Sequence, residues 1–408
     1  MDITKITKNP LYYVLYSVSL IVSILILMAT LYLLKPINIK DEQYLFEIQK
    51  GETLYNISTK LANDGLIPSP FILRKIMYYT GLDYNIRAGE YQITPGMRTF
   101  DLIKMITTGN VKRYDLQIIE GSTLTDLFAK FKESTVIKKT VNYDREQKLI
   151  DEDLVKSLRE LIKKDHLHLV VNLDELNTLE GLLFPDKYFY SKGETDLNLL
   201  KRALVKLNKT LDKEWENREF KESSVVKTPY QVLTLASILE KESSDPDDRK
   251  LVAGVVYNRL KANMPLQVDP TVIYALGNKY TGNLTKEDLK FKSKYNTYVA
   301  YGLPPGPIGF VSLNAIHAAL NPTIHNMIYF VSMGNGKHFF SATLDEHNAA
   351  VQKYQKSSII KTPNLTNEPQ SNKVSESVPR TLTNFDEKTS IFKSTNNNIS
   401  DIHKNNKK

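Results

Sequence analysis

An uncharged apolar segment near the N-terminus places the strongest constraint on this chain. Residues 11–34 form a run of 24 positions without Asp, Glu, Lys or Arg. At about 1.5 Å per residue, a helix of that length exceeds the roughly 30 Å hydrocarbon core of a bilayer. Tyrosines lie near both ends of the run, where amphipathic rings favour the headgroup boundary. The segment predicts a transmembrane helix, preceded by a cytoplasmic N-terminus of residues 1–10.

A cleaved signal peptide is the alternative interpretation of this segment. Its apolar region would span about 7 to 15 residues and would end in small residues at a cleavage site. The sequence Leu-Leu-Lys-Pro at residues 33–36 is a poor site and favours a retained anchor. Lys5 and Lys8 before the run are matched by Lys35 and Lys40 after it. The positive-inside rule therefore does not decide the orientation.

Composition excludes several classes of function. The chain has no cysteine, which rules out a disulfide scaffold, thiol catalysis and cysteine-ligated metal sites. The net charge of +8 comes from 54 basic residues against 46 acidic ones, thinly spread along the chain. No basic run is interleaved with aromatic residues, so nucleic-acid binding is not predicted. The 7 histidines show no convincing ligand spacing, and we expect neither a metal nor another cofactor.

A strand-like segment followed by an amphipathic helix begins the body of the chain. Residues 46–48 alternate as in a strand, and Leu54, Ile57 and Leu61 share one face of the next predicted helix. This stretch resembles the opening of a LysM module, a small strand-helix-helix-strand unit that binds N-acetylglucosamine polymers. An ordinary strand-turn-helix is the alternative. We expect a LysM-like α+β subdomain over residues 35–112.

Fainter versions of this pattern return further along the chain. Residues 96–106 and 121–131 predict more small strand-helix units, and hence an α+β fold rather than a doubly wound sheet. Residues 113–360 are expected to form a mixed α/β catalytic domain, in which about 140–225 is a charged, helix-rich insertion. From residue 361 to residue 408 the chain is rich in Asn, Ser and Thr, with scattered apolar positions. Burial cannot offset the ordering entropy of such a segment, so this tail is predicted to be disordered.

One predicted helix carries a carboxylate on its apolar side. Thr-Pro-Tyr-Gln at residues 228–231 indicates an N-cap, a proline in the first turn and a capping box. Residues 232–239 are then mostly apolar. At about 100° per residue, Glu240 falls between Ala236 and Leu233 on the helical wheel. The pattern directs the Glu240 carboxylate into an apolar arc.

Such a position suits acid catalysis. Apolar surroundings disfavour the charged form of a carboxylate, which is how a glutamate stays protonated near neutral pH and serves as a general acid. Glycosidic cleavage needs this property. Glu240 could instead end a core helix at the surface, or pair with Arg249 or Arg259. Glu242 also lies beside the apolar arc, and periodicity does not choose between the two glutamates.

Two later segments carry candidate binding residues. Asp269 precedes a proline at the start of a short predicted helix, where a role as N-cap would explain it. Contact with sugar hydroxyls, together with Gln267, is the alternative. Asn296 and Tyr298 belong to an aromatic stretch that continues through residues 301–308. Because pyranose faces stack on aromatic rings, this loop suits a glycan groove, although a rigid connector would look the same.

Several motifs that occur in one order, between residues 46 and 354, together resemble the endolytic murein transglycosylase family, also called YceG-like. The anchor before them fits the family's layout. The motifs are residues 179–188, 236–242, 257–260, 264–274, 295–298, 302–308, 330–341 and 346–348.

The resemblance implies a function. Glu240 corresponds to the family's catalytic glutamate, which would cleave the MurNAc–GlcNAc bond of peptidoglycan strands and leave 1,6-anhydroMurNAc ends. The family is associated with terminating nascent strands beside peptidoglycan synthases. The resemblance thus implies a bacterial inner-membrane lyase whose catalytic domain lies outside the cytoplasm. Its expected partners are glycan strands, the membrane and the synthases.

If the chain has this function, five residues are candidates for substrate binding: Glu242, Gln267, Asp269, Asn296 and Tyr298. The chain departs from the family's pattern at Lys294, where proline is frequent, and at Val311-Ser312, where Pro-Gly is usual. Two rival functions remain. One is a non-catalytic peptidoglycan-binding membrane scaffold. The other is a water-using muramidase with Asp269 or Glu180 as its second carboxylate.

Overall fold

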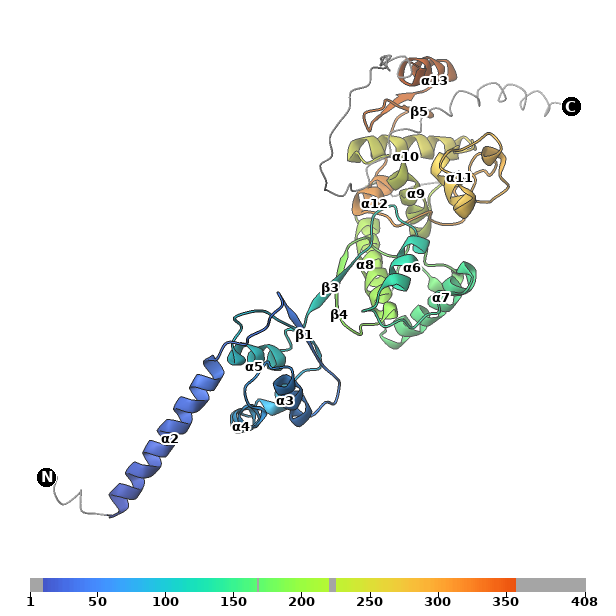
Figure 1. Cartoon of the computed structure of the whole chain (residues 1–408). Helices are drawn as coiled ribbons and strands as arrows, with labels where there is room; N and C mark the ends of the chain where they lie inside the picture. The colour runs from blue at the N-terminus through green and yellow to red at the C-terminus, as the bar shows by residue number, and fades with distance from the viewer. Residues whose placement is uncertain (1–9, 167–168, 220–224, 357–408) are drawn as a thin grey trace, which may run out of the picture. The chain divides into compact units, whose positions relative to one another are not determined.

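The computed structural model describes residues 10–166, 169–219 and 225–356 (Figure 1). The predicted tail and the first nine residues of the predicted N-terminal segment lie outside the described residues. The described chain divides into two compact units. Unit 1 contains the residues up to Leu116 together with 136–138 and 189–194, and unit 2 contains the remainder.

The predicted apolar helix is present as α2 (Pro10–Leu34). It is the one helix among the described residues that is long and apolar enough to cross a membrane. Its C-terminal end belongs to the core of unit 1, because Tyr32 is buried there with Ile37. The Tyr32 hydroxyl also donates a hydrogen bond to the carbonyl of Ser69 at 2.7 Å.

Unit 1 continues as strand, helix, helix and strand. The strands β1 and β2 are antiparallel, with a register from Tyr44 opposite Ile93 to Ile48 opposite Gly89. Their inward side chains and those of the three helices form one apolar core. The elements are β1 (Tyr44–Ile48), α3 (Leu54–Asn63), α4 (Pro70–Thr80), the 3₁₀ turn η1 (Asp83–Asn85), β2 (Gly89–Ile93) and α5 (Thr99–Thr108).

Two further strands, β3 (Arg113–Gln117) and β4 (Lys187–Ser191), form a two-stranded sheet. Unit 2 is mainly helical, with the antiparallel hairpin β5–β6 near its C-terminal end. Its elements are α6 (Leu124–Glu133), α7 (Gln147–Lys164), η2 (Leu173–Glu175), α8 (Asp196–Glu216), α9 (Pro229–Glu242), α10 (Pro246–Lys261), α11 (Asp269–Leu276), η3 (Gly277–Lys279), η4 (Asp288–Lys290), α12 (Leu313–Leu320), β5 (Tyr329–Ser332), β6 (His338–Ser341), α13 (Leu344–Val351) and the π-helical turn η5 (Gln352–Lys356).

The helix α9 forms the centre of unit 2. It begins as the sequence predicts, since Thr228 and Gln231 form a capping box and a proline occupies the first turn. Every residue from Val232 to Leu239 is buried, and α9 packs against α10, α11 and α12 (Figure 1). Such a helix is apolar on all sides because neighbours surround it. Its C-terminal turn therefore delivers side chains into the interior of unit 2.

The expected mixture of helices and strands is present, but the second region is more helical than expected. A mixed α/β domain was predicted over residues 113–360, whereas the described strands there are the hairpin β5–β6 and the short pair β3–β4. The two predicted strand-helix units around residues 96–106 and 121–131 are present, since α5 follows β2 and α6 follows β3. The helix-rich insertion does contain two long helices, α7 and α8.

Candidate active site

Glu240 lies in the last turn of α9, and polar partners enclose its carboxylate. Oε1 accepts a hydrogen bond from Nη2 of Arg249 at 3.1 Å. Oε2 accepts two from Ser312, one from the backbone N–H at 2.8 Å and one from the hydroxyl at 2.5 Å. The Glu240 side chain is 9% exposed and that of Arg249 is 5% exposed. The two residues thus form a largely buried ion pair, one of the arrangements that the sequence left open.

The surroundings of Glu240 differ from the apolar pocket that the helical wheel suggested. Leu233 and Ala236 are fully buried, as expected for the apolar arc of α9. The carboxylate, however, extends past them to Arg249 on α10 and Ser312 at the start of α12. Periodicity within one helix could not reveal these partners. The expectation of purely apolar surroundings was wrong for the carboxylate itself.

The guanidinium of Arg249 is held in place by more than its ion pair. Its Nε donates to the carbonyl of Ser243 at 2.8 Å, and its Nη1 donates to the hydroxyl oxygen of Ser312 at 3.4 Å. Arg249 is buried, so these acceptors replace water for the donors that do not face Glu240. The result is a cation whose position relative to the carboxylate is fixed by three separate contacts.

The loop before α12 runs alongside α9 and ends at the carboxylate. Early in this stretch, the backbone N–H of Ile308 donates to the hydroxyl of Ser237 at 2.9 Å. At its end Ser312 caps α12, with its hydroxyl oxygen accepting the N–H of Ala315 at 3.2 Å. The hydroxyl has one hydrogen, which it directs to Glu240. The departure from the family's usual Pro-Gly therefore adds a donor next to Glu240.

A second loop, around Gly121, packs against the first one near Glu240. Gly121 donates its N–H to the carbonyl of Phe310, and Phe310 donates to the carbonyl of Ser122, both at 2.8 Å. The backbones approach so closely that a Cβ on Gly309 would lie 2.9 Å from the carbonyl oxygen of Gly121. A Cβ on Gly121 would in turn lie 3.9 Å from Cγ of Glu240. Glycines at these positions bring backbone against the Glu240 side chain.

Glu242 faces a different group of charges. Burial raises its pKa to about 7, and Asp269 and Asp248 add to the rise while His338 opposes it. Asp248 itself accepts the backbone N–H of His338 at 2.8 Å, and the Nδ1 atom of that ring lies 2.7 Å from its other oxygen. The charged form of Glu242 is therefore less favourable than that of an ordinary exposed glutamate.

The structure brings Asp269 and Tyr298 together. The predicted role of Asp269 as N-cap is wrong, because Val268 caps α11 and Asp269 is its first residue. The Asp269 carboxylate instead accepts the hydroxyl of Tyr298 at 2.5 Å. Burial raises the pKa of Asp269, and this hydrogen bond opposes the rise. Gln267 lies nearby with a φ of 52°, and its backbone N–H donates to the carbonyl of Thr297 at 3.1 Å.

Asn296 is placed differently from the other candidates. It is fully buried, and its Nδ2 donates to the carbonyls of Leu289 at 3.0 Å and Phe291 at 2.8 Å. Its Oδ1 accepts the backbone N–H of Tyr298 at 2.9 Å. Because both the nitrogen and the oxygen of this amide are hydrogen-bonded to the backbone, the geometry favours a structural role over contact with a substrate.

A further buried carboxyl group belongs to Glu180. Its two oxygens lie 3.1 and 3.3 Å from the backbone nitrogen of Leu124, which donates to them, and the hydroxyl of Tyr274 donates at 3.4 Å. Burial raises the pKa of Glu180 to about 8, and Asp151 adds to the rise while the two donors oppose it. Glu180 therefore carries a proton in most molecules at pH 7.

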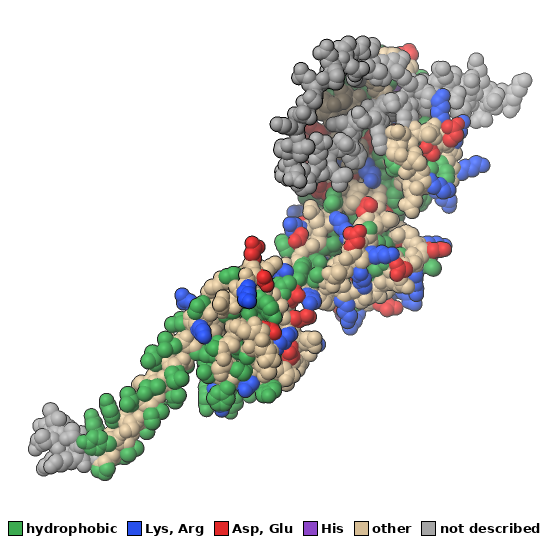
Figure 2. Space-filling model, viewed as in Figure 1, with side chains coloured by type: hydrophobic (Ala, Val, Ile, Leu, Met, Phe, Trp, Pro, Cys, Tyr) green, Lys and Arg blue, Asp and Glu red, His purple; other side chains and the backbone are tan. Residues whose placement is uncertain are grey.

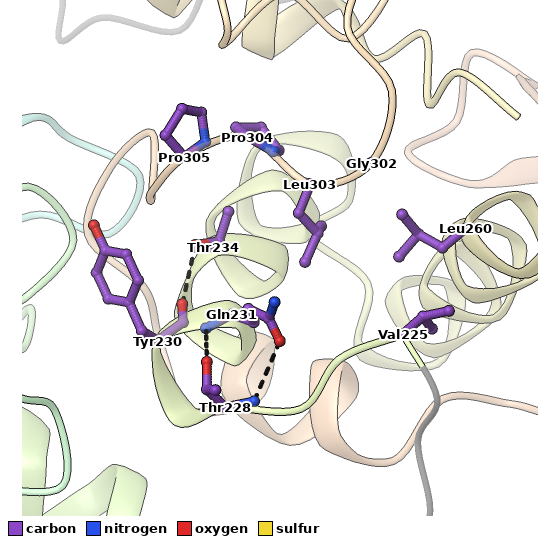
Figure 3. A pocket seen from close by; sticks show the side chains of 10 residues that line it. All are labelled: Val225, Thr228, Tyr230, Gln231, Thr234, Leu260, Gly302, Leu303, Pro304 and Pro305. Carbon is purple, nitrogen blue, oxygen red and sulfur yellow. Dashed lines mark hydrogen bonds between the residues drawn. The ribbon is translucent and has the colours of Figure 1, made fainter. Parts of the chain in front are cut away.

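The aromatic and proline-rich loop lines a pocket of about 550 Å³ beside the first half of α9. Tyr230, Gln231 and Thr234 of α9 face residues 302–305 there, and the side chain of Leu303 extends toward them (Figure 3). Glu240 is not among the residues that line this pocket. The loop thus forms a concave surface at the end of α9 opposite to the carboxylate.

Sequence reasoning left two contact residues of Glu240 unassigned. Arg249 was named only as a partner that would argue against catalysis, and Ser312 only as a departure from a motif. The N-cap pattern of Ser312 before residues 313–320 was the one local signal for its position. Its contact with Glu240, 72 positions earlier, depends on the packing of α9 against α12.

The chain belongs to the YceG-like family, whose model matches residues 46–353. It is similar to the endolytic murein transglycosylase of Bacillus subtilis (strain 168), with 33% identity over 328 residues, 79% of this chain and 88% of that protein. The protein of the same name from Streptococcus pneumoniae (strain D39) is 30% identical over 348 residues, covering 80% of this chain and 61% of its own.

A solved structure is also similar to this chain. It is described as a yceG-like protein from Listeria monocytogenes and is 31% identical, with a TM-score of 0.49. The match covers 76% of this chain and 100% of that structure.

Proposed function

We propose that this chain is an endolytic murein transglycosylase in which Glu240 acts first as a general acid and then as a general base. The proposal rests on one observation above all. A single carboxylate, nearly buried and held at both oxygens, lies at the end of the central helix in the family-matched region. The name shared by relatives at 30 and 33% identity supports the same activity.

The first step breaks the bond between C1 of MurNAc and the oxygen of the departing GlcNAc. Glu240, which is ionised in its pair with Arg249, first takes up a proton. It then gives this proton to that oxygen as the C1–O bond opens, so the sugar leaves as an alcohol. Positive charge develops at C1, and the glutamate becomes a carboxylate. Arg249 and Ser312 then stabilise the carboxylate, because their donors already point at the two oxygens.

The second step closes a ring within MurNAc. The C6 hydroxyl oxygen attacks C1, and its proton passes to the Glu240 carboxylate, which restores the acid. The product ends in 1,6-anhydroMurNAc, and no water is consumed. One carboxyl group therefore serves both steps, whereas hydrolysis of a glycoside requires two.

We infer different tasks for the two oxygens of Glu240 from their hydrogen bonds. Oε2 accepts two donors from Ser312, one of which is a backbone N–H that cannot rotate away. Oε1 accepts one longer bond from Arg249. A proton is accommodated more easily on Oε1, so Oε1 is the atom that transfers it, and Ser312 is a positioning residue.

The rival muramidase needs a second carboxylate that is ionised and free to activate water. Glu180 is largely protonated at neutral pH because burial raises its pKa to about 8. Asp269 accepts the hydroxyl of Tyr298. Neither is prepared to act as a base. We assign Glu242, Gln267, Asp269 and Tyr298 to substrate binding around the cleavage site.

The remaining parts of the chain fit this activity. The helix α2 serves as a single-pass anchor in the bacterial inner membrane, with the catalytic domain on the extracytoplasmic side, where nascent glycan strands and their synthases are found. We propose that unit 1, whose elements run in the order β1-α3-α4-β2, is a LysM-like module that binds N-acetylglucosamine units. Residues 35–112 and 113–360 act as the binding and catalytic domains in this scheme.

The test is digestion of purified glycan strands by the full-length protein, followed by mass spectrometry of the ends. The wild type should give anhydro ends, and Glu240→Gln should give almost none, since general acid-base catalysis is worth about 10²- to 10⁴-fold. Glu133→Gln, the same substitution at an exposed position on α6, is the matched control and should still form anhydro ends. Unchanged cleavage by Glu240→Gln would contradict the proposal. Reducing ends from the wild type would favour the muramidase, and no cleavage by the wild type would favour the scaffold.

A further inference from the structure

The outer face of α4 carries an exposed group of aromatic and basic side chains. Phe71, Lys75, Tyr78 and Tyr79 follow the i, i+4, i+7, i+8 spacing of one helical side. Phe71 is 59%, Tyr78 is 62% and Tyr79 is 78% exposed. The opposite side of the helix is buried in the core of unit 1. We call these four residues the α4 aromatic face, and Figure 2 shows hydrophobic side chains gathered over this helix.

The members of the face interact with one another but cover little of their own surface. The Lys75 ammonium lies 5.7 Å from the centre of the Phe71 ring and 5.9 Å from that of Tyr79. The rings of Tyr78 and Tyr79 pack edge to face at 5.5 Å. Exposed tyrosines mixed with a cation are typical of the headgroup region of a bilayer.

The position of α4 relative to α2 is fixed within unit 1. The Tyr32 hydroxyl, in the last turn of α2, donates to the carbonyl of Ser69 at 2.7 Å, and Ser69 is the N-cap of α4. Immediately after α2, the N–H of Ile37 donates to the carbonyl of Met97 at 2.7 Å. These contacts leave no free linker between the helix and unit 1. The start of α4 therefore lies at the level where α2 ends.

We propose that the α4 aromatic face lies in the headgroup region of the same bilayer that α2 spans. This inference depends on the proposed anchor. Its continuity with α2 decides the occupant, because the contact between Tyr32 and Ser69 holds the start of α4 beside the end of the apolar helix. Lys75 complements the phosphates of the lipids at that depth. The contact would hold unit 1 flat against the membrane surface.

The absence of cysteine allows a direct test on the full-length chain. Single cysteines replace Tyr79, Leu25 in the middle of α2, and Phe189, an exposed aromatic residue of unit 1 on β4. Each variant is spin-labelled and placed in nanodiscs of phosphatidylglycerol and phosphatidylethanolamine. Accessibility to oxygen, which enters lipid, is compared with accessibility to a water-soluble nickel chelate. The label at Tyr79→Cys should lose nickel accessibility and gain oxygen accessibility relative to that at Phe189→Cys.

Each other outcome has a distinct meaning. If the label at Leu25→Cys is protected from nickel while that at Tyr79→Cys is as accessible as the control, the anchor stands and the α4 contact is refuted. If the label at Leu25→Cys is itself accessible to nickel, the anchor fails and the contact fails with it. Protection of the Tyr79→Cys label by N-acetylglucosamine oligomers in detergent, without protection by nanodisc lipid, would overturn the proposal in favour of a glycan surface.

Discussion

Replacement of Glu180 by glutamine should stabilise unit 2 at neutral pH without abolishing activity. Glu180 is 5% exposed, and its pKa is raised from 4.5 to about 8, mainly by burial. The protonated side chain and the amide of glutamine have the same shape. The amide oxygen can accept the N–H of Leu124 and the amide nitrogen can donate to Tyr274, the two partners that Glu180 now has.

The raised pKa of Glu180 decides how the unfolding free energy changes with pH. The folded protein binds the Glu180 proton more tightly than the unfolded chain does. The stability from this group is complete below about pH 4.5 and is lost as the pH rises to about 8. One pKa unit corresponds to about 1.4 kcal/mol, so unfolding free energy should fall by about 1.4 kcal/mol per pH unit across most of that range. At pH 7 the variant should exceed the wild type by about 3 kcal/mol at most.

The assay uses the single tryptophan of the chain, Trp215, which lies on α8 in unit 2. Urea unfolding in detergent is followed by its fluorescence from pH 5 to pH 8. The unfolding free energy of the wild type should fall as the pH rises, and that of Glu180→Gln should not. Glu133→Gln, at an exposed position on α6, is the matched control and should keep the slope. Equal slopes for wild type and Glu180→Gln, or loss of lytic activity as complete as in Glu240→Gln, would refute the reasoning.

Two further predictions concern the partners of Glu240. Ser312→Ala keeps the backbone N–H but removes a hydrogen bond to a charged group worth about 1.5 to 3 kcal/mol, so kcat should fall roughly 10- to 100-fold with little change in KM. Ser312→Thr should restore kcat, and a variant that alters only KM would argue against a positioning role. Arg249→Met breaks a buried ion pair and should lower the unfolding free energy by about 3 to 5 kcal/mol. Made in a Glu240→Gln background, the same change should cost less, and strictly additive losses would show that the pair is not coupled.

The sequence was most informative where chemistry is local. The apolar run of α2 and the capping signals at Thr228 depend on neighbouring residues, so both helices could be predicted close to their observed ends. The position of Glu240 at the end of a buried helix followed from the same reasoning. The strand-helix unit around residues 121–131 could be predicted for the same reason, since β3 precedes α6 there.

The environment of Glu240 could not be predicted because it is assembled from distant segments. Arg249 comes from the next helix, and Ser312 comes from a loop 72 residues away. The same limit explains Asp269. Its place before a proline suggested an N-cap, but its carboxylate accepts a hydrogen bond from the hydroxyl of Tyr298. In each case the side chain is placed by a hydrogen bond to a residue that is distant in the sequence, which local propensity does not indicate.

The most direct test of a single carboxyl group serving both proton transfers is the origin of the oxygen at the new sugar end. Glycan strands would be digested by the full-length protein in water enriched in oxygen-18, and the product ends would be weighed by mass spectrometry. We predict anhydro ends of unchanged isotopic mass, because the C6 hydroxyl supplies the oxygen that attacks C1. Ends heavier by one oxygen-18 atom, carried on a reducing sugar, would mean that water is the nucleophile and would contradict the account.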